Sequence, residues 1–133
     1  MYLVTREIRF CYGHRLLDYA GKCRYLHGHN GRAVISLAAP ELDTLGMVMD
    51  FTQIKRVVST WIDDKLDHKM LLHKNDPILP LLRQQGEPVF LMETNPTAEN
   101  IARLIYEKTR DAGENTFMVC ELLTVLAKTV RKG

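Results

Sequence analysis

Three histidines in the first quarter of the chain have spacings that could place them around one metal ion. His27 and His29 lie two residues apart in a strand-like run, so their side chains would point to the same side. His14 ends the preceding strand-like run, on the parity of its apolar residues. If the two runs pair as antiparallel strands, the three imidazoles meet on one face. Three imidazoles with an open fourth position are typical of catalytic Zn²⁺; the alternative is histidines that are simply hydrogen-bonded in the core.

A thiol and an adjacent acid–base pair could add proton transfer to such a metal site. Cys23 lies four residues before His27, where a nearby cation would lower the pKa of its thiol. Asp67 and His68 close a helical pattern, and a carboxylate that orients an imidazole beside a thiol forms a base relay. The alternatives are a small buried cysteine and an ordinary helix terminus.

Glu121 is a carboxylate in an otherwise apolar strand-like run, so it needs a partner. A flat heterocycle with adjacent N–H groups would be one, and water at a sheet edge is the alternative. The other two cysteines, Cys11 and Cys120, lie inside predicted strands and are interpreted as small buried residues. His73 is interpreted as a surface residue.

Hydrophobic periodicity predicts the elements that must position these groups. Alternation predicts strands over residues 2–12 and 27–39, and one or two strands over residues 116–130. A helical period begins at Thr52, with Asp50 or Thr52 as the cap.

A second helix is predicted to open at Asn95-Pro96-Thr97. Asn95 or Thr97 would be its cap, Pro96 would lie in its first turn, and Gly113 would end it. Residues 71–92 contain three prolines and a glycine, and show no clear period beyond room for a short helical turn.

Composition indicates one globular domain over residues 1–133. Hydrophobic residues make up 46% and charged residues 26%, and the net charge is +2. No cluster of Lys or Arg indicates a nucleic-acid surface, no apolar run is long enough to cross a bilayer, and no signal peptide is evident. Three cysteines, an odd number, favour a reducing cytoplasm over a disulfide framework.

Five short motifs together resemble the 6-pyruvoyl-tetrahydropterin synthase superfamily, which includes the bacterial 6-carboxy-tetrahydropterin synthases of queuosine biosynthesis. They are Phe10-x-x-x-His14-Arg15-Leu16, Cys23-x-x-x-His27-Gly28-His29, Gly46-Met47-Val48-Met49-Asp50-Phe51 with Ile54-Lys55, Leu66-Asp67-His68 and Asn95-Pro96-Thr97-Ala98-Glu99-Asn100. Each motif is weak alone, but all five in this order are specific and span most of the chain.

The resemblance implies an α+β tunnelling fold (T-fold): a four-stranded antiparallel sheet with two helices on one face, in ββααββ order. Subunits would join edge to edge into a barrel, as trimers stacked into hexamers, which would cover the open edges of a small sheet.

The resemblance also implies the roles of the candidate residues. Zn²⁺ would be held by His14, His27 and His29. Cys23 would be the general base, with Asp67 and His68 as its relay. Glu121 would anchor a pterin ring, with Thr97 and Glu99 nearby.

The implied activity is that of a zinc-dependent lyase on 7,8-dihydroneopterin triphosphate. The product would be 6-carboxy-5,6,7,8-tetrahydropterin, with loss of triphosphate and acetaldehyde. The alternatives are a 6-pyruvoyl-tetrahydropterin synthase, a non-catalytic zinc- and pterin-binding paralogue, and a three-histidine zinc hydratase or hydrolase.

The sequence departs from the family pattern in two places. Glu121 is followed by Leu122 and Leu123 where the family has Thr and small residues, and residues 71–92 form a longer segment than in compact bacterial members. Arg15, Lys22 and Arg24 are candidate triphosphate contacts by charge and proximity.

Overall fold

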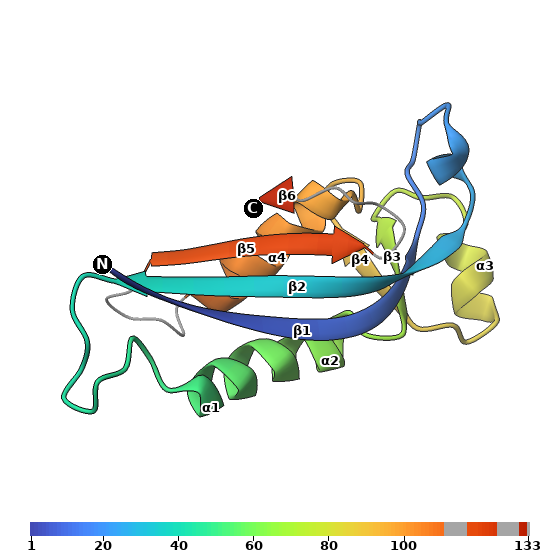
Figure 1. Cartoon of the computed structure of the whole chain (residues 1–133). Helices are drawn as coiled ribbons and strands as arrows, with labels where there is room; N and C mark the ends of the chain where they lie inside the picture. The colour runs from blue at the N-terminus through green and yellow to red at the C-terminus, as the bar shows by residue number, and fades with distance from the viewer. Residues whose placement is uncertain (111–116, 125–130, 133) are drawn as a thin grey trace.

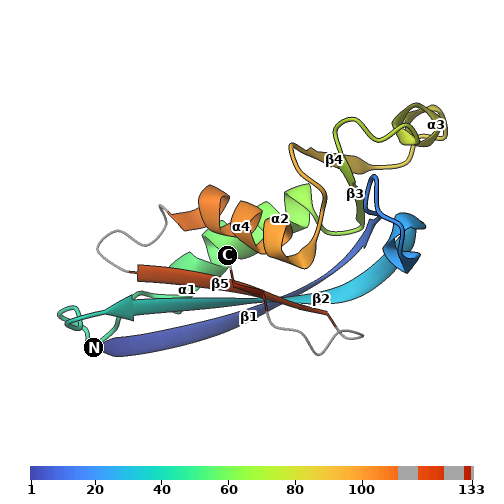
Figure 2. The ribbon, with the colours of Figure 1, turned by 90° about the horizontal axis from the view of Figure 1, so that it is seen from above.

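A mixed β-sheet carries helices on one of its faces (Figures 1 and 2). The computed structural model describes residues 1–110, 117–124 and 131–132. Within these ranges the sheet has six strands in the order β4-β3-β1-β2-β5-β6. The strands are β1 (Tyr2–His14), β2 (His27–Ala39), β3 (Lys69–His73), β4 (Val89–Met92), β5 (Phe117–Thr124) and β6 (Arg131–Lys132). No helix in the described ranges is both long and apolar enough to span a membrane.

The two longest strands form an antiparallel hairpin that confirms the predicted alternation. Their register runs from Tyr2 opposite Ala39 to His14 opposite His27. Even-numbered β1 residues from Ile8 onward and odd-numbered β2 residues from Gly31 onward are buried on the same face. One face of the hairpin therefore packs against the core while the other stays open.

The first predicted helix is confirmed, with an irregular middle. It consists of α1 (Phe51–Ile54), a π-helical segment, η2 (Lys55–Ser59), and α2 (Thr60–Lys65). The Oδ1 atom of Asp50 accepts a 2.8 Å hydrogen bond from the Thr52 N–H, as expected of a cap. Ile54, Val58, Ile62 and Leu66 recur every four residues and are fully or nearly fully buried.

The second predicted helix is α4 (Ala98–Thr109), and Thr97 is its cap. The Thr97 hydroxyl accepts a 3.1 Å hydrogen bond from the Asn100 N–H. Pro96 therefore precedes the cap instead of lying in the first turn, and the predicted end at Gly113 lies outside the described residues. The α1–α2 helix and α4 cover the same face of the sheet (Figure 2).

The expected four-stranded antiparallel sheet in ββααββ order is wrong. Residues 71–92 contribute most of β3, then α3 (Leu79–Gln84), then β4, before α4 begins. β3 pairs parallel to β1, and β4 pairs parallel to β3, so the sheet is mixed. Strands of four or five residues are too short to show a period, and their partners are distant in sequence. The longer segment therefore widens the sheet beside the histidine end of the hairpin (Figure 1).

Candidate metal centre and proton-relay residues

The three candidate ligand histidines meet at one end of the β1–β2 hairpin, as the alternation predicts. His14 lies directly opposite His27, and His29 lies opposite Tyr12. The three imidazole centroids are 4.5 Å, 4.8 Å and 5.0 Å apart. One potential ligand nitrogen from each ring lies within 4.8 Å of the other two. We call His14, His27 and His29 the histidine triad.

Backbone carbonyls orient two of the three rings. The Nδ1 atom of His14 lies 2.6 Å from the Pro96 carbonyl oxygen, and that of His27 lies 2.7 Å from the Tyr25 carbonyl oxygen. A carbonyl only accepts hydrogen bonds, so each Nδ1 carries the proton and each Nε2 keeps its lone pair. Metal-ligating histidines are commonly held in this way.

Burial favours the neutral, metal-binding form of His14 and His29. Burial lowers the pKa of His14 to about 4, and the charges of His27 and His29 act in the same direction against the Pro96 hydrogen bond. Burial and the charge of His27 also lower the pKa of His29. Neutral imidazole at pH 7 offers a lone pair without first losing a proton.

The donor set fits a metal ion. In the described part of the chain, three buried side-chain polar atoms have no hydrogen-bond partner: His14 Nε2, His29 Nδ1 and Tyr12 Oη. An unpartnered buried polar atom costs about 1–3 kcal/mol. A divalent ion between the imidazoles would satisfy both nitrogens, and three histidine ligands suit Zn²⁺. The chemistry and burial of these atoms therefore support a metal centre.

Cys23 lies in the loop that joins the two strands of the hairpin. It belongs to the 3₁₀ turn η1 (Lys22–Arg24) and is half-buried. Its carbonyl oxygen accepts a 2.8 Å hydrogen bond from the Leu16 N–H, which ties the two sides of the loop together. Cys23 belongs to neither of the two groups of potential metal-ligating side chains found among the described residues.

Asp67 and His68 form the predicted carboxylate–imidazole hydrogen bond. The distance from Asp67 Oδ2 to His68 Nδ1 is 2.9 Å. Both residues clamp the backbone of Cys11: its N–H donates to Asp67 Oδ1 at 2.9 Å, and its carbonyl accepts from the His68 N–H at 2.7 Å. His68 has a φ of +59°, a left-handed conformation that costs free energy in a non-glycine residue and often occurs at functional sites.

The environment of Asp67 favours its ionised form. Burial opposes ionisation, but the hydrogen bonds from the Cys11 N–H and His68, with the charges of His68 and Lys69, outweigh it. Together they hold the pKa of the Asp67 carboxyl below its usual range. An ionised Asp67 fixes the proton on His68 Nδ1, which leaves Nε2 to exchange protons with a ligand.

The thiol that lies beside this dyad is Cys11, which sequence reasoning assigned to the core. Cys11 is exposed, and its Sγ atom donates a hydrogen bond to Asn30 Oδ1 at 3.0 Å. Ligand atoms of Cys11, Asp67 and His68 lie within 4.8 Å of one another. Parity is the signal that could have shown this, because an odd-numbered β1 residue points away from the buried Phe10 and Tyr12. The buried assignment is confirmed for Cys120, where burial and the charge of Glu121 raise the pKa to about 12.

Glu121 does not meet the histidine triad within one chain. Its neighbours Cys120 and Leu122 are fully buried, whereas Glu121 is half-buried and opposite Val34 in the register. It therefore lies on the open face, while the triad shares the helix-covered face.

Thr97 and Glu99 lie at the start of α4. Thr97 follows Pro96, whose carbonyl oxygen contacts His14, and its hydroxyl is used in the helix cap. Glu99 is exposed in the first turn. The structure therefore places Thr97 one residue from a group that orients the triad.

Two of the three candidate phosphate contacts are already engaged. Arg15 forms a salt bridge through Nη2 and a 2.8 Å hydrogen bond through Nε to Asp76, a carboxylate that is only 3% exposed. Arg24 donates to the Ala20 carbonyl at 2.8 Å and lies over the Tyr25 ring. The role of Arg15 is thus to hold the hairpin loop against the segment after β3.

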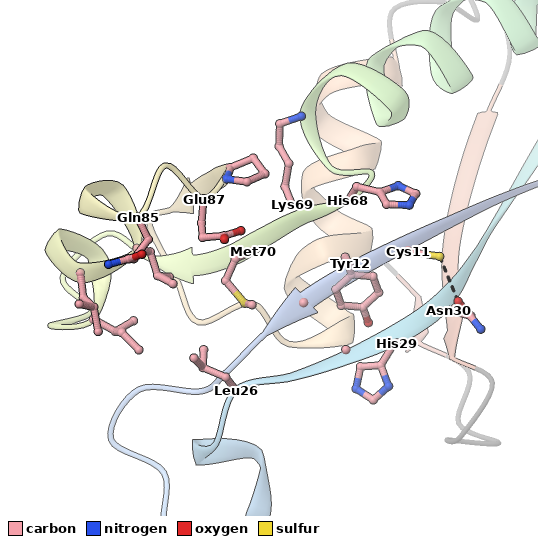
Figure 3. A pocket seen from close by; sticks show the side chains of 16 residues that line it. Cys11, Tyr12, Leu26, His29, Asn30, His68, Lys69, Met70, Gln85 and Glu87 are labelled. Atoms are coloured by element: carbon pink, nitrogen blue, oxygen red, sulfur yellow. Dashed lines mark hydrogen bonds between the residues drawn. The ribbon is translucent and has the colours of Figure 1, made fainter.

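A cavity of about 1010 Å³ opens beside the end of the hairpin (Figure 3). Gly13 and Gly28, opposite each other in the register, form part of its wall, and His29 and His68 both line it. α3 and the residues after it form the facing wall, mainly with Leu81, Leu82, Gln85, Glu87 and Pro88. The longer segment 71–92 thus shapes the cavity between these two histidines.

Comparisons with known proteins agree with this geometry. The model of the family described as 6-pyruvoyl tetrahydropterin synthase matches residues 3–129. A 6-carboxy-5,6,7,8-tetrahydropterin synthase of Rickettsia felis is 44% identical over 100 residues, covering 74% of this chain and 72% of the relative. An enzyme of the same name from Synechocystis is 32% identical over 135 residues, covering 98% and 92%.

Solved structures share the fold over almost the whole chain. An uncharacterized protein of Wolinella succinogenes superposes with a TM-score of 0.83 at 25% identity, covering 99% of this chain and 97% of that one. The 6-pyruvoyl tetrahydropterin synthase of Plasmodium falciparum has a TM-score of 0.75 at 16% identity, with coverage of 99% and 97%. The matching architecture supports the T-fold, and the family match over nearly every residue shows that this chain belongs to the 6-pyruvoyl tetrahydropterin synthase family.

Proposed function

We propose that the chain is a zinc-dependent lyase that converts 7,8-dihydroneopterin triphosphate to 6-carboxy-5,6,7,8-tetrahydropterin, with loss of triphosphate and acetaldehyde. The observation that carries the proposal is the histidine triad, with two buried ring nitrogens that lack partners. The names of the relatives favour this product over the 6-pyruvoyl one. The product would belong to queuosine-type biosynthesis.

The triad would hold the zinc ion, with His14 and His27 oriented by the carbonyls of Pro96 and Tyr25. Bound zinc would acidify substrate hydroxyls and stabilise developing oxyanions. His14, the most buried of the three, lies where electrostatic interactions are stronger than in water.

Proton transfer is assigned to Cys23, Asp67 and His68. Cys23, in the loop that joins the two strands of the hairpin, would be the general base. His68 would accept or donate a proton at Nε2, because its Nδ1–H is held by Asp67. Glu121 would anchor the pterin ring through two parallel hydrogen bonds to adjacent N–H groups, with Thr97 and Glu99 near the ring.

This set of residues supports a homo-oligomer, either a trimer or a hexamer. Within one chain, Glu121 lies on the open face and the triad lies on the helix-covered face, so one chain does not bring all the proposed residues together. β4 and β6 are the edges of the described sheet, and unpaired edges are commonly covered by another subunit. Edge-to-edge assembly would let neighbouring chains complete each site. All three cysteines are free, which supports a reducing, cytoplasmic location.

The decisive experiment is mass spectrometry of the products formed from 7,8-dihydroneopterin triphosphate. We expect the 6-carboxy product and acetaldehyde from the zinc-loaded protein, none after chelation, and recovery when zinc is restored. A 6-pyruvoyl product would contradict the proposed reaction but keep the site. No turnover in a preparation that retains zinc would instead support a binding paralogue.

A further inference from the structure

Tyr12 completes a square of four rings at the end of the hairpin. The register places Tyr12 opposite His29, next to the pair of His14 and His27, and all four residues project from the same face. The Tyr12 ring centroid lies 5.2 Å from that of His14 and 5.7 Å from that of His29. Three corners of this square are the histidine triad, and the fourth is a phenol.

The hydroxyl of Tyr12 is buried without a partner. Tyr12 is only 3% exposed, and its Oη atom is one of the three buried unpartnered side-chain polar atoms in the described part of the chain. The other two belong to His14 and His29, which the Tyr12 ring contacts. Buried tyrosine hydroxyls normally find a hydrogen-bond partner. Because the three unpartnered atoms lie on neighbouring rings, we infer that they share one polar binding site instead of being unsatisfied independently of one another.

Packing holds the Tyr12 ring in this orientation. The Phe10 ring stacks on it at a centroid distance of 5.4 Å. Gly31, opposite Phe10 in the register, leaves room for the ring, because a Cβ atom there would lie 3.0 Å from Tyr12 Cε1. In Figure 3 the hydroxyl end of Tyr12 points to the side on which His29 lies. The phenol is thus fixed by its surroundings instead of being free to turn toward solvent.

We propose that the Tyr12 hydroxyl donates a hydrogen bond to the oxygen ligand, a substrate hydroxyl or a water molecule, that occupies the side of the histidine triad left open by the three imidazoles. This inference rests on the proposed metal centre and adds a residue to it. A phenol donor at this place would orient the substrate oxygen and stabilise negative charge that develops on it.

The test compares Tyr12→Phe with Tyr106→Phe and His14→Ala in the full-length protein. Tyr106→Phe removes a phenol hydroxyl from α4, away from the triad, and is the matched control. His14→Ala removes a proposed ligand. Each protein is examined for zinc affinity by chelator competition, for the visible spectrum of its Co²⁺-loaded form, and for kcat and KM with 7,8-dihydroneopterin triphosphate.

We expect Tyr12→Phe to change the Co²⁺ spectrum and to lower kcat by about 10–100-fold, while zinc affinity changes less than about threefold. Tyr106→Phe should match the parent protein in every measurement. The spectrum reports on the centre even if the substrate proves to be a different one.

Two results would overturn the role of Tyr12 alone. One is a Co²⁺ spectrum and kcat that Tyr12→Phe leaves unchanged. The other is a loss of zinc affinity as large as that of His14→Ala, which would make Tyr12 a ligand and not a hydrogen-bond donor. Full zinc affinity in His14→Ala would instead contradict the metal centre itself, and with it this inference.

Discussion

The two faces of the β1–β2 hairpin are built in different ways. On the helix-covered face, the histidine triad is assembled by strands that are adjacent in sequence, and carbonyls of Tyr25 and Pro96 orient its rings. On the open face, the Asp67–His68 dyad reaches the hairpin from the end of a distant helix and clamps the backbone of Cys11. Glu121 reaches the same face from β5.

The histidine triad is assembled within a single chain. The Asp67–His68 dyad and Glu121 lie on the other face, so one chain does not bring them to the triad. His14 is buried, and the three candidate ligand nitrogens meet within one chain. The His68 side chain is 78% accessible and that of Asp67 is 28% accessible, and His68 lines the cavity together with His29. Metal binding and proton transfer should therefore respond separately to mutation.

The largest effect is expected from His14→Ala, which removes a ligand on the helix-covered face. Zinc affinity should fall by more than about 100-fold, beyond the range seen when a residue outside the ligand set is lost. Turnover should fall with it. Competition with a chelator measures the affinity, and His73→Ala removes an imidazole outside the triad as a control. Near-parental affinity in His14→Ala would show that the triad is not the metal site.

The open face is tested by His68→Asn, because asparagine tolerates a left-handed backbone. We expect kcat to fall by about 10²–10⁴-fold through loss of acid–base catalysis, with zinc content unchanged. Steady-state kinetics and metal analysis of the same preparation measure both. If His68→Asn loses zinc together with activity, metal binding and proton transfer do not respond separately to mutation, and the proposed difference between the two faces is wrong.

Arg15→Gln tests the connection between the hairpin loop and the segment after β3. It leaves the buried Asp76 carboxylate without its cation, which should lower the free energy of unfolding by about 3 kcal/mol at pH 7. Urea denaturation of the chelated protein measures this without a contribution from bound metal. Lys74→Gln, which breaks an exposed pair with Glu93, should lower the free energy of unfolding far less.

The pH dependence of this effect has a defined sign. Burial raises the pKa of Asp76, but hydrogen bonds from Arg15 and the Ile78 N–H outweigh it and hold the pKa below its usual range. The stabilisation is therefore present above the pKa of the unfolded chain, about 3.9, and is lost as pH falls through the lower folded value. The difference between parent and Arg15→Gln should shrink in strong acid. A constant difference across this range would contradict the assignment.

The smallest effect is expected from Thr97→Ala, which removes the cap of α4 next to the carbonyl that orients His14. The free energy of unfolding should fall by about 1 kcal/mol. Zinc affinity should change little, because the Pro96 carbonyl is part of the backbone. Thermal denaturation and chelator competition test both. A large loss of zinc would mean that the helix cap also sets the position of His14.

The hairpin and the two main helices were predictable because they depend on local patterns, although the order of all the elements was not. Alternation placed His14, His27 and His29 on one face, and the helical periods placed Ile54 through Leu66 and the start of α4 in the core. These features involve residues close in sequence, or strands joined by one loop, so each pattern itself specifies the contact. The Asp67–His68 pair was only a candidate relay on its sequence, because adjacency does not prove a hydrogen bond; the structure supplies the 2.9 Å contact.

Tertiary structure alone decided the rest. β3 and β4 are too short to show a period, and their parallel pairing with a distant strand is a non-local contact. The same contact brings Asp67 and His68 to Cys11, and the pairing of β5 with β2 puts Glu121 on the open face. The sequence by itself therefore determined the three candidate metal ligands and the face that they share. Two features depend on pairings between segments more than fifty residues apart, which no local pattern encodes: the thiol that lies beside the Asp67–His68 pair, and the separation of Glu121 from the histidine triad within one chain.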